Sequence, residues 1–313
     1  MTILEKIRNS IKESTWVTGG IDKEIEKLIE DGSISSALVL INETLKKSPQ
    51  SLYLLTQKAE VLDDLKRFAE ANLAYDKVLE RDPEFQEIWY NKGIVLHELG
   101  NYEDAVKAFD KSIELEPEGV GALSLKADSL LQLEKFNEGL DVIEKVLRIE
   151  PNDLVSLEIK AAILSELNKH SEAITILEKI SSIDTEDIDS LVTISAEYLE
   201  LKEFSKALEI TEKALVLDKN DSAALGNKGE ALYELGKIDE ALEYTLKSQK
   251  IEPADDEVWY QKARILSTVN SEEALDSLLV AVSINPENKE RSLKEKSFEE
   301  MKNQERFKKM TQT

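Results

Sequence analysis

The stretch "EIWYNKG" at residues 87–93 returns as "EVWYQKA" at residues 257–263. The tryptophans of these two stretches, Trp89 and Trp259, lie 170 residues apart, which is five times 34. The prolines follow the same period, with successive spacings of 34, 34, 34, 102 and 33: Pro49, Pro83, Pro117, Pro151, Pro253 and Pro286. Because proline lacks the N–H group that a helix interior requires, a periodic proline predicts a periodic helix end.

Small and apolar residues repeat with the same period and predict what each unit contains. Trp89, Gly93 and Leu96 share one helical face, residues 105–115 carry a second apolar stripe, and Gly100 lies in the break between them. Each unit therefore reads as an antiparallel helix pair. One series of small residues keeps this period along the chain, with one residue lost before its last member: Ala37, Ala71, Ala105, Gly139, Ala173, Ala207, Ala241 and Ala274.

Charge and composition exclude several classes of function. The 313 residues include 64 Asp and Glu against 40 Lys and Arg, a net charge of −24, which repels nucleic acids and anionic membranes. The chain has no cysteine, so thiolate metal sites and cysteine nucleophiles are absent. The N-terminus is too charged for a signal peptide, and no apolar run reaches the roughly 20 residues of a membrane span. We expect a cytoplasmic protein with no nucleic-acid or membrane partner.

The segment "WYNKGIVLHELGNYEDAVKAFDKSIELEP", residues 89–117, resembles a tetratricopeptide repeat (TPR), a family with a 34-residue period and a Trp, Gly, Ala, Phe, Pro pattern. Lysine replaces the family's usual leucine before the small residue in six units, and residues 188–221 match least well. Extending the resemblance along the chain gives eight repeats: 18–51, 52–85, 86–119, 120–153, 154–187, 188–221, 222–255 and 256–288.

The resemblance implies an all-α fold, an α-solenoid of antiparallel helix pairs wound as a right-handed superhelix, with the first helices lining a concave groove. Residues 1–17 are expected to form an N-terminal capping helix, and residues 289–313 a C-terminal capping helix and tail. The tail reads as one helix over 289–310 that docks through Leu293, Phe298 and Met301. The six repeated lysines are expected to lie along the helix packing and reach nearby acidic groups.

Chemistry-bearing motifs are scarce. The only histidines, His97 and His170, lie in different repeats, and no phosphate loop or nucleophile motif occurs. We therefore expect no catalytic residue, metal or cofactor, and no enzymatic activity.

The groove is expected to be acidic with scattered aromatic anchors, a surface suited to a Lys- or Arg-rich protein segment. A carboxylate clamp of the kind found in TPR co-chaperones is excluded, because Thr56 and Glu60 replace its Lys and Asn. The expected partner-binding residues are Glu60, Asp64, Tyr90, Asn91, His97, Glu98, Asp128, Asn227, Glu230, Tyr233, Glu234, Tyr260 and Arg264.

The preferred interpretation is a non-enzymatic protein–protein interaction scaffold that is a monomer or a weak homo-oligomer. Two alternatives stay open at this point. One is a self-associating structural protein that uses end-on packing or tail exchange. The other is a small-molecule receptor or an enzyme with an acid-lined site, which would require a deep closed cavity.

Overall fold

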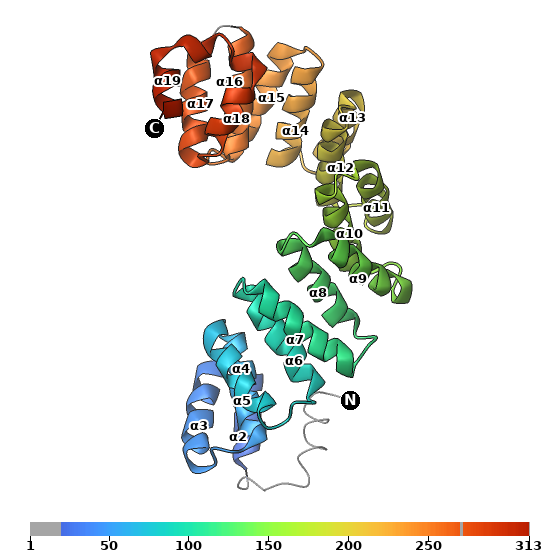
Figure 1. Cartoon of the computed structure of the whole chain (residues 1–313), viewed down its shortest axis with the longest axis vertical. Helices are drawn as coiled ribbons and strands as arrows, with labels where there is room; N and C mark the ends of the chain where they lie inside the picture. Colours follow the sequence, from blue (N-terminus) through green and yellow to red (C-terminus); the bar gives the residue numbers. More distant parts are fainter. Residues whose placement is uncertain (1–19, 270–271, 313) are drawn as a thin grey trace. The chain divides into compact units, whose positions relative to one another are not determined.

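The chain folds into successive helix pairs (Figure 1). The computed structural model describes residues 20–269 and 272–312, and all regular elements within these ranges are helical. The predicted N-terminal capping helix at 1–17 lies outside the described residues. The pairs are α2 (Ile21–Glu30) with α3 (Ile34–Lys47), α4 (Leu52–Asp64) with α5 (Phe68–Leu79), α6 (Gln86–Glu98) with α7 (Tyr102–Leu115), α8 (Val120–Gln132) with α9 (Phe136–Ile149), α10 (Leu154–Glu166) with α11 (His170–Ile183), α12 (Ile188–Glu200) with α13 (Phe204–Leu217), α14 (Ser222–Glu234) with α15 (Ile238–Ile251), and α16 (Asp256–Thr268) with α17 (Glu273–Ile284). The all-α solenoid predicted from the sequence is confirmed.

The turn inside each of the first seven pairs uses the same left-handed backbone position, which recurs every 34 residues. At Gly100, whose φ is +72°, the amide N–H donates to the His97 carbonyl, and the next amide, of Asn101, donates to the Leu96 carbonyl. These two bonds satisfy carbonyls that the helix end would otherwise leave open. The equivalent residues with positive φ are Gly32, Lys66, Glu134, Asn168, Lys202 and Gly236. Since four of the seven positions are not glycine, helix packing enforces the turn.

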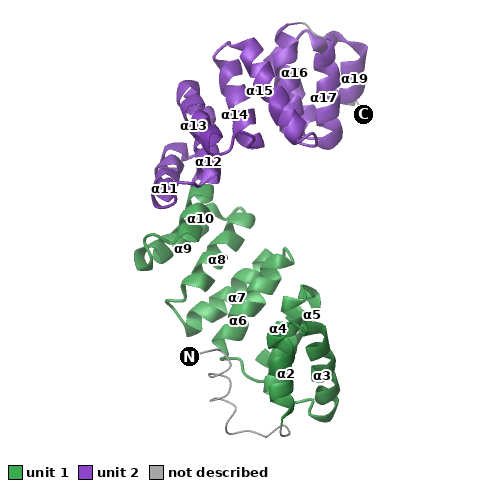
Figure 2. Cartoon of the chain, turned by 180° about the vertical axis from the view of Figure 1, so that it is seen from behind, with its two compact units in different colours: residues 1–163 green, residues 164–313 purple. Residues whose placement is uncertain are grey.

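The helices divide into two compact units, residues 1–163 and 164–313, with the boundary inside α10 (Figure 2). In unit 1, one cluster of buried side chains includes Leu54, Tyr75 and Ile88, and a further cluster surrounds Phe109. In unit 2, buried clusters form around Leu232 and Ile265 and around Tyr260. Each unit has its own core, and the sites are described separately within each.

The two tryptophans of the opening motif make the same contact. The indole Nε1 of Trp89 donates to the carbonyl oxygen of Pro83 at 2.8 Å, and that of Trp259 donates to Pro253 at 2.8 Å. Each bond ties a first helix to the proline-containing loop before it. The shared period of tryptophan and proline therefore has a direct structural cause.

The periodic small residues permit close helix approach. An added Cβ at Gly93 would lie 2.5 Å from Cε1 of Phe109 in the partner helix α7, far inside van der Waals contact. Ala105, on the same partner helix, is fully buried. A larger residue at Gly93 would force α6 and α7 apart.

Four of the six repeated lysines form ion pairs with the second helix of the preceding pair, as the sequence interpretation expected. Each acidic partner precedes its lysine by the same number of positions, and two of the Nζ–carboxylate distances are 3.3 Å. The pairs are Lys92–Asp76, Lys126–Asp110, Lys160–Glu144 and Lys228–Glu212. These lysines connect successive helix pairs, which is a structural role.

The C-terminal segment packs on the last helix pair, but it is not the single helix predicted over 289–310. It forms α18 (Asn288–Lys294), 3₁₀ turns at Lys296–Phe298 and Met301–Asn303, and α19 (Glu305–Gln312). Phe298, Met301, Phe307 and Met310 are buried against α16 and α17, whereas Leu293, an expected docking residue, is 47% exposed. On one straight helix, Phe298 and Phe307 would point about 180° away from each other. The breaks let both rings enter the same core.

None of the helices that the structure describes has both the length and the apolar character required to cross a lipid bilayer.

Candidate functional site

The thirteen expected partner-binding residues all lie on first helices, but they belong to two units. Unit 1 holds Glu60 and Asp64 on α4, Tyr90, Asn91, His97 and Glu98 on α6, and Asp128 on α8. Unit 2 holds Asn227, Glu230, Tyr233 and Glu234 on α14, and Tyr260 and Arg264 on α16. They therefore form two separate candidate surfaces.

Unit 2 contains a groove with a volume of about 630 Å³ along α12, α14 and α16. Its apolar lining includes Leu199, Phe204 and Val258, and Asn227 and Gln261 contribute amides. Its charged lining consists of Glu200, Glu230, Glu234, Asp255 and Glu257 against Lys202 and Arg291. We refer to this feature as the unit 2 groove. Carboxylates predominate in it, and Glu200, Asp255 and Glu257 were not among the expected binding residues.

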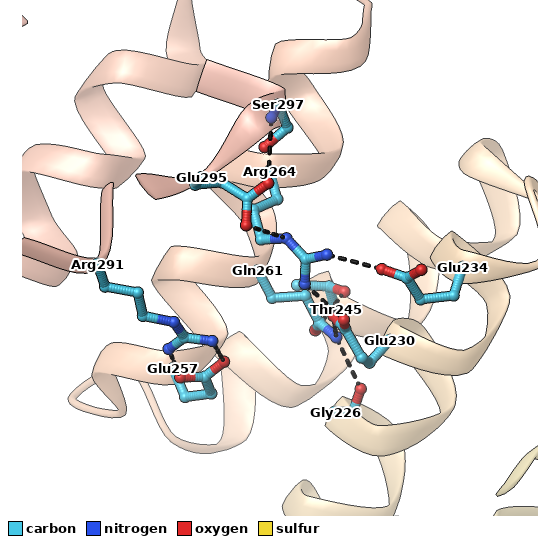
Figure 3. Close-up of polar contacts among 10 residues, drawn as sticks. All are labelled: Gly226, Glu230, Glu234, Thr245, Glu257, Gln261, Arg264, Arg291, Glu295 and Ser297. Atoms are coloured by element: carbon cyan, nitrogen blue, oxygen red, sulfur yellow. Dashed lines mark hydrogen bonds and ion pairs between the residues drawn. The ribbon is translucent and has the colours of Figure 1, made fainter. Parts of the chain in front are cut away.

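Arg264 occupies the centre of an ion-pair cluster beside this groove (Figure 3). Its Nη1 pairs with Glu230, its Nη2 lies 2.7 Å from Oε1 of Glu234, and its Nε lies 3.4 Å from Oε2 of Glu295. The guanidinium carbon is 4.7 Å from the centre of the Tyr233 ring, and the side chain is only 12% exposed. Burial alone would favour the neutral form, but Glu230 and Glu295 outweigh it and raise the pKa of Arg264.

This geometry corrects the expectation that Arg264 is open to a partner. Its guanidinium is already bound by three carboxylates of its own chain, and the same contacts engage Glu230 and Glu234. Gln261 strengthens the cluster, because its Nε2 donates to Glu230 and to the Gly226 carbonyl, each at 3.0 Å. An internal arginine thus offsets part of the acidity predicted for this surface.

Tyr260 is also not an exposed anchor. It is fully buried, the Phe298 ring lies edge-on at 5.5 Å, and the guanidinium of Arg291 lies 4.1 Å from its ring centre. Burial raises the pKa of Tyr260 to about 12. Arg291 also forms an ion pair with Glu257. The docked C-terminal segment, which the sequence interpretation treated as one helix, covers this tyrosine.

Asn227 connects neighbouring first helices. Its Nδ2 donates to Oγ of Ser195 at 2.8 Å and to the carbonyl of Val192 at 3.2 Å, both on α12. Its amide N–H groups therefore hold α14 against α12 rather than projecting toward a partner.

In unit 1, Glu60 lies half-buried on α4 and accepts a hydrogen bond from Nε2 of Gln57 at 2.7 Å. Burial raises the pKa of Glu60 to about 7, with further increases from Glu87, Asp64 and Asp63. Asp64, one helical turn later, is exposed. Burial, followed by the charge of Asp64, also raises the pKa of Asp63, a residue that the sequence interpretation did not select.

The remaining unit 1 residues lie on α6 and α8. Tyr90 and Asn91 are half-buried and Glu98 is exposed. The imidazole of His97 reaches α8, where its Nδ1 is 3.0 Å from Oγ of Ser129 and its Nε2 is 3.3 Å from Oδ2 of Asp128. His97 and Asp128 were expected separately and form one pair. Within the described ranges, no group of three or more His, Asp or Glu side chains has the arrangement needed for a metal ion.

Sequence reasoning missed a buried polar contact of Glu197 in unit 2. Glu197 on α12 is 6% exposed, and its carboxylate accepts hydrogen bonds from Oγ of Ser165 and from Nδ1 of His170, the latter at 2.7 Å. His170 is the first residue of α11. The sequence did contain a signal for this contact. The positions equivalent to Glu197 in the two neighbouring repeats are the apolar Ile163 and Ala231, so a glutamate at this position stands out.

Comparisons with known families and structures agree with the repeat architecture. The family model described as "Tetratricopeptide repeat" matches residues 56–120, and the one described as "Anaphase-promoting complex, cyclosome, subunit 3" matches residues 167–248. The comparison with curated proteins returned no match.

Three solved structures illustrate the shared fold. A tetratricopeptide repeat protein from Parabacteroides merdae ATCC 43184 is 16% identical, with 77% of this chain and 96% of that chain covered and a TM-score of 0.60. A chain of the APC/C hetero-tetramer Cut9–Hcn1 is 16% identical, with 93% of this chain and 55% of that chain covered and a TM-score of 0.58. The present chain therefore spans about half the length of that one. MamA 41-end from Desulfovibrio magneticus RS-1 is 20% identical, with 55% of this chain and 97% of that chain covered and a TM-score of 0.51.

At these identities the structural neighbours establish the fold and nothing finer. Three observations identify the family: the 34-residue period, the helix pairs with their recurring turn, and the family match at residues 56–120. The chain is a tetratricopeptide repeat protein.

Proposed function

We propose that this protein is a non-enzymatic adaptor that binds a Lys- or Arg-bearing segment of another protein on its first-helix faces. Tetratricopeptide repeat proteins generally mediate protein–protein interactions, and the unit 2 groove is the observation that carries the more specific proposal. Five carboxylates and two cationic side chains line this groove beside apolar side chains such as Leu199 and Val258.

The groove retains negative charge after its internal ion pairs are taken into account. Arg264 binds Glu230 and Glu234, and Arg291 binds Glu257. Within the described ranges, Glu200 and Asp255 have no ion-pair partner. A basic segment would gain attraction from these two side chains and from the field of a chain with net charge −24.

The preformed surface favours a peptide ligand. The groove is built on helices that hydrogen bonds such as Asn227–Ser195 hold together, so little ordering of the protein is required on binding. We include in the proposal an array of eight repeats over 18–288, capped by residues 1–17 and 289–313, and a cytoplasmic location.

A fluorescence polarisation titration tests the proposal. The probe is a labelled 12-residue peptide of alternating Arg and Ala, compared with the same peptide carrying Glu in place of Arg. We expect binding of the basic peptide only, with an affinity that falls steeply between about 50 and about 300 mM salt.

Matched charge reversals locate the binding. Glu200→Lys changes the groove, whereas Glu240→Lys makes the same charge change at an exposed position of α15 outside the groove lining. We expect Glu200→Lys to weaken binding about tenfold and Glu240→Lys to have little effect. Equal effects of the two variants, or binding that is independent of salt, would contradict the proposal.

Self-association by tail exchange is the weaker alternative. Phe298 and Phe307 are buried against α16 and α17 of the same chain, so exchange would first expose both rings. Sedimentation over a concentration series separates the two functions, since an adaptor of this kind stays monomeric across the series.

A further inference from the structure

The Arg264 cluster has a counterpart in unit 1 that lacks its arginine. A shift of five repeats, the same shift that separates the two tryptophans, relates Glu230 to Glu60 and Glu234 to Asp64. The same shift relates Arg264 to Ile94. Both carboxylate pairs are spaced i, i+4 on a first helix, α14 in unit 2 and α4 in unit 1. The chain therefore presents the same pair twice, once with its cation and once without.

Unit 2 shows what such a pair can hold. One guanidinium spans both carboxylates, pairing with Glu230 through Nη1 and with Glu234 through Nη2. A planar guanidinium suits this arrangement because its N–H groups point in several fixed directions.

In unit 1 the pair has no such partner. Among the described residues, no Lys, Arg or His forms an ion pair with Glu60 or Asp64, and Glu60 accepts a side-chain hydrogen bond from the amide of Gln57 alone. Glu87, Asp63 and Asp64 add negative charge around Glu60, and burial together with these charges moves its pKa to about 7. An acidic pair that is partly buried and unneutralised favours a cationic ligand.

Two fully buried hydroxyl groups at the same place also lack a hydrogen bond of normal geometry. They belong to Thr56 on α4 and Tyr75 on α5, and both residues are 0% exposed. Burial, followed by the charges of Asp63 and Glu60, raises the pKa of Tyr75, whose hydroxyl lies within reach of the Asp63 carboxylate and of Asn91, and Asn91 opposes part of this increase. Thr56 is the equivalent, five repeats earlier, of Gly226, whose carbonyl accepts a hydrogen bond within the Arg264 cluster. The Thr56 hydroxyl, which is buried beside the acidic pair without a hydrogen-bond partner in the described part of the chain, is a polar group that the fold itself leaves unsatisfied.

We propose that Glu60 and Asp64 form an arginine site, which binds the guanidinium of an arginine side chain on a partner protein in the way that Glu230 and Glu234 bind Arg264. This inference rests on the proposed function, since it specifies one contact of the basic segment. Arginine is preferred to lysine because its planar guanidinium can bond both carboxylates at once in a fixed geometry. Asp63 stands where unit 2 has Tyr233, so the arginine site relies on charge and has no aromatic ring at that position.

The experiment uses the full chain and the peptide acetyl-Ala-Ala-Arg-Ala-Ala-amide. The control peptide carries citrulline, which has the same shape as arginine but no charge. Binding is followed by NMR through the backbone amides of residues 56–64. We expect the arginine peptide to shift these signals with millimolar affinity, and the citrulline peptide to bind at least about fivefold more weakly.

Ile94→Arg tests the geometry directly, because it supplies the arginine that the repeat equivalence places there. We expect this variant to lose the response to the peptide and to lower the pKa of the Glu60 carboxyl, measured by ¹³C NMR. Ile94→Gln, a neutral side chain at the same position, should retain both the response and the raised pKa. The pKa readout keeps the test decisive if side-chain bulk alone affects peptide binding.

The outcomes separate this inference from the proposed function. Unchanged binding and an unchanged Glu60 pKa in Ile94→Arg would overturn the arginine site, even if Glu200→Lys still weakened the 12-residue peptide. Loss of the short-peptide response in Ile94→Arg with no effect of Glu200→Lys would support the arginine site and contradict the role of the unit 2 groove. If the wild-type protein bound neither peptide, both proposals would fail.

Discussion

The substitution Glu60→Gln is expected to stabilise the protein above neutral pH, whereas the equivalent Glu230→Gln is expected to destabilise it. Both changes remove one carboxylate charge from the same position of the repeat, Glu60 in the second repeat and Glu230 in the seventh. Glu60 carries a charge that burial and neighbouring acids oppose, while Glu230 forms an ion pair with Arg264. The two variants therefore act as controls for each other.

The magnitude follows from the pKa of Glu60, which is raised from the usual value of about 4.3 to about 7 in the folded protein. The folded carboxyl thus binds its proton more tightly than the unfolded one. Stability falls as pH rises from about 4 to about 7 and then levels off, since each pH unit in that window removes about 1.4 kcal/mol. Because Glu60 retains some solvent access, which screens its charge, we expect a total of about 2–3 kcal/mol.

Glutamine removes this penalty because it stays neutral and still accepts the hydrogen bond from Gln57. Glu60→Gln should raise the free energy of unfolding by about 2 kcal/mol at pH 8 and by less than about 1 kcal/mol at pH 5. Glu230→Gln should lower it by about 1–2 kcal/mol at both values, since it weakens a charged hydrogen bond to Arg264.

Urea denaturation followed by circular dichroism at pH 5.0 and 8.0 provides the measurement, with unchanged m-values as the check that only stability has moved. Amide exchange of α4 and α14 gives a local readout in each unit. Equal destabilisation by both substitutions at pH 8 would refute the reasoning, as would a Glu60→Gln effect that did not change with pH.

Three further substitutions test the packing, the turns and the buried pair. Gly93→Ala should cost about 1–3 kcal/mol, because the new methyl group overlaps the Phe109 ring; thermal melts check this, and a neutral result would contradict close α6–α7 packing. Lys202→Gly should stabilise by about 0.5–1 kcal/mol, because it relieves a left-handed backbone (φ +57°) at a non-glycine residue, and a lower urea midpoint would count against this. His170→Ala should cost about 1–3 kcal/mol by removing a donor to the buried Glu197, and proteolysis resistance equal to wild type would show that the pair contributes nothing.

The fold could be predicted from the sequence because its determinants are periodic. Proline, tryptophan and small residues recur at fixed positions of the repeat, and the structure gives each a repeated contact, such as Trp89–Pro83 and Gly93–Phe109. A chance match at one repeat is outweighed by agreement across the others. The C-terminal segment has no such support from repetition, and the prediction of one continuous helix over 289–310 was wrong.

The site could be predicted only in part, because a residue on a first helix was interpreted without its neighbour in the next repeat. Glu230 and Glu234 were chosen as acidic, and Arg264 was treated as an interruption, although the three side chains meet. Tyr260 was chosen as an aromatic anchor, but Phe298 covers it. These errors share one cause, since the repeat phase gives a residue's helix face and says nothing of the side chain packed across from it.

The contacts in the structure supply the missing rule. Polar pairs between adjacent first helices are separated by about one repeat, as for Arg264–Glu230, Arg264–Glu234, Asn227–Ser195 and Ser165–Glu197. A first-helix carboxylate is therefore neutralised where a cation on the next first helix faces it, as Arg264 faces Glu230 and Glu234. At Glu60 the equivalent neighbour is Ile94, and Lys92 on the same helix pairs with Asp76 instead, so no arginine of the described chain takes the place that Arg264 has beside Glu230.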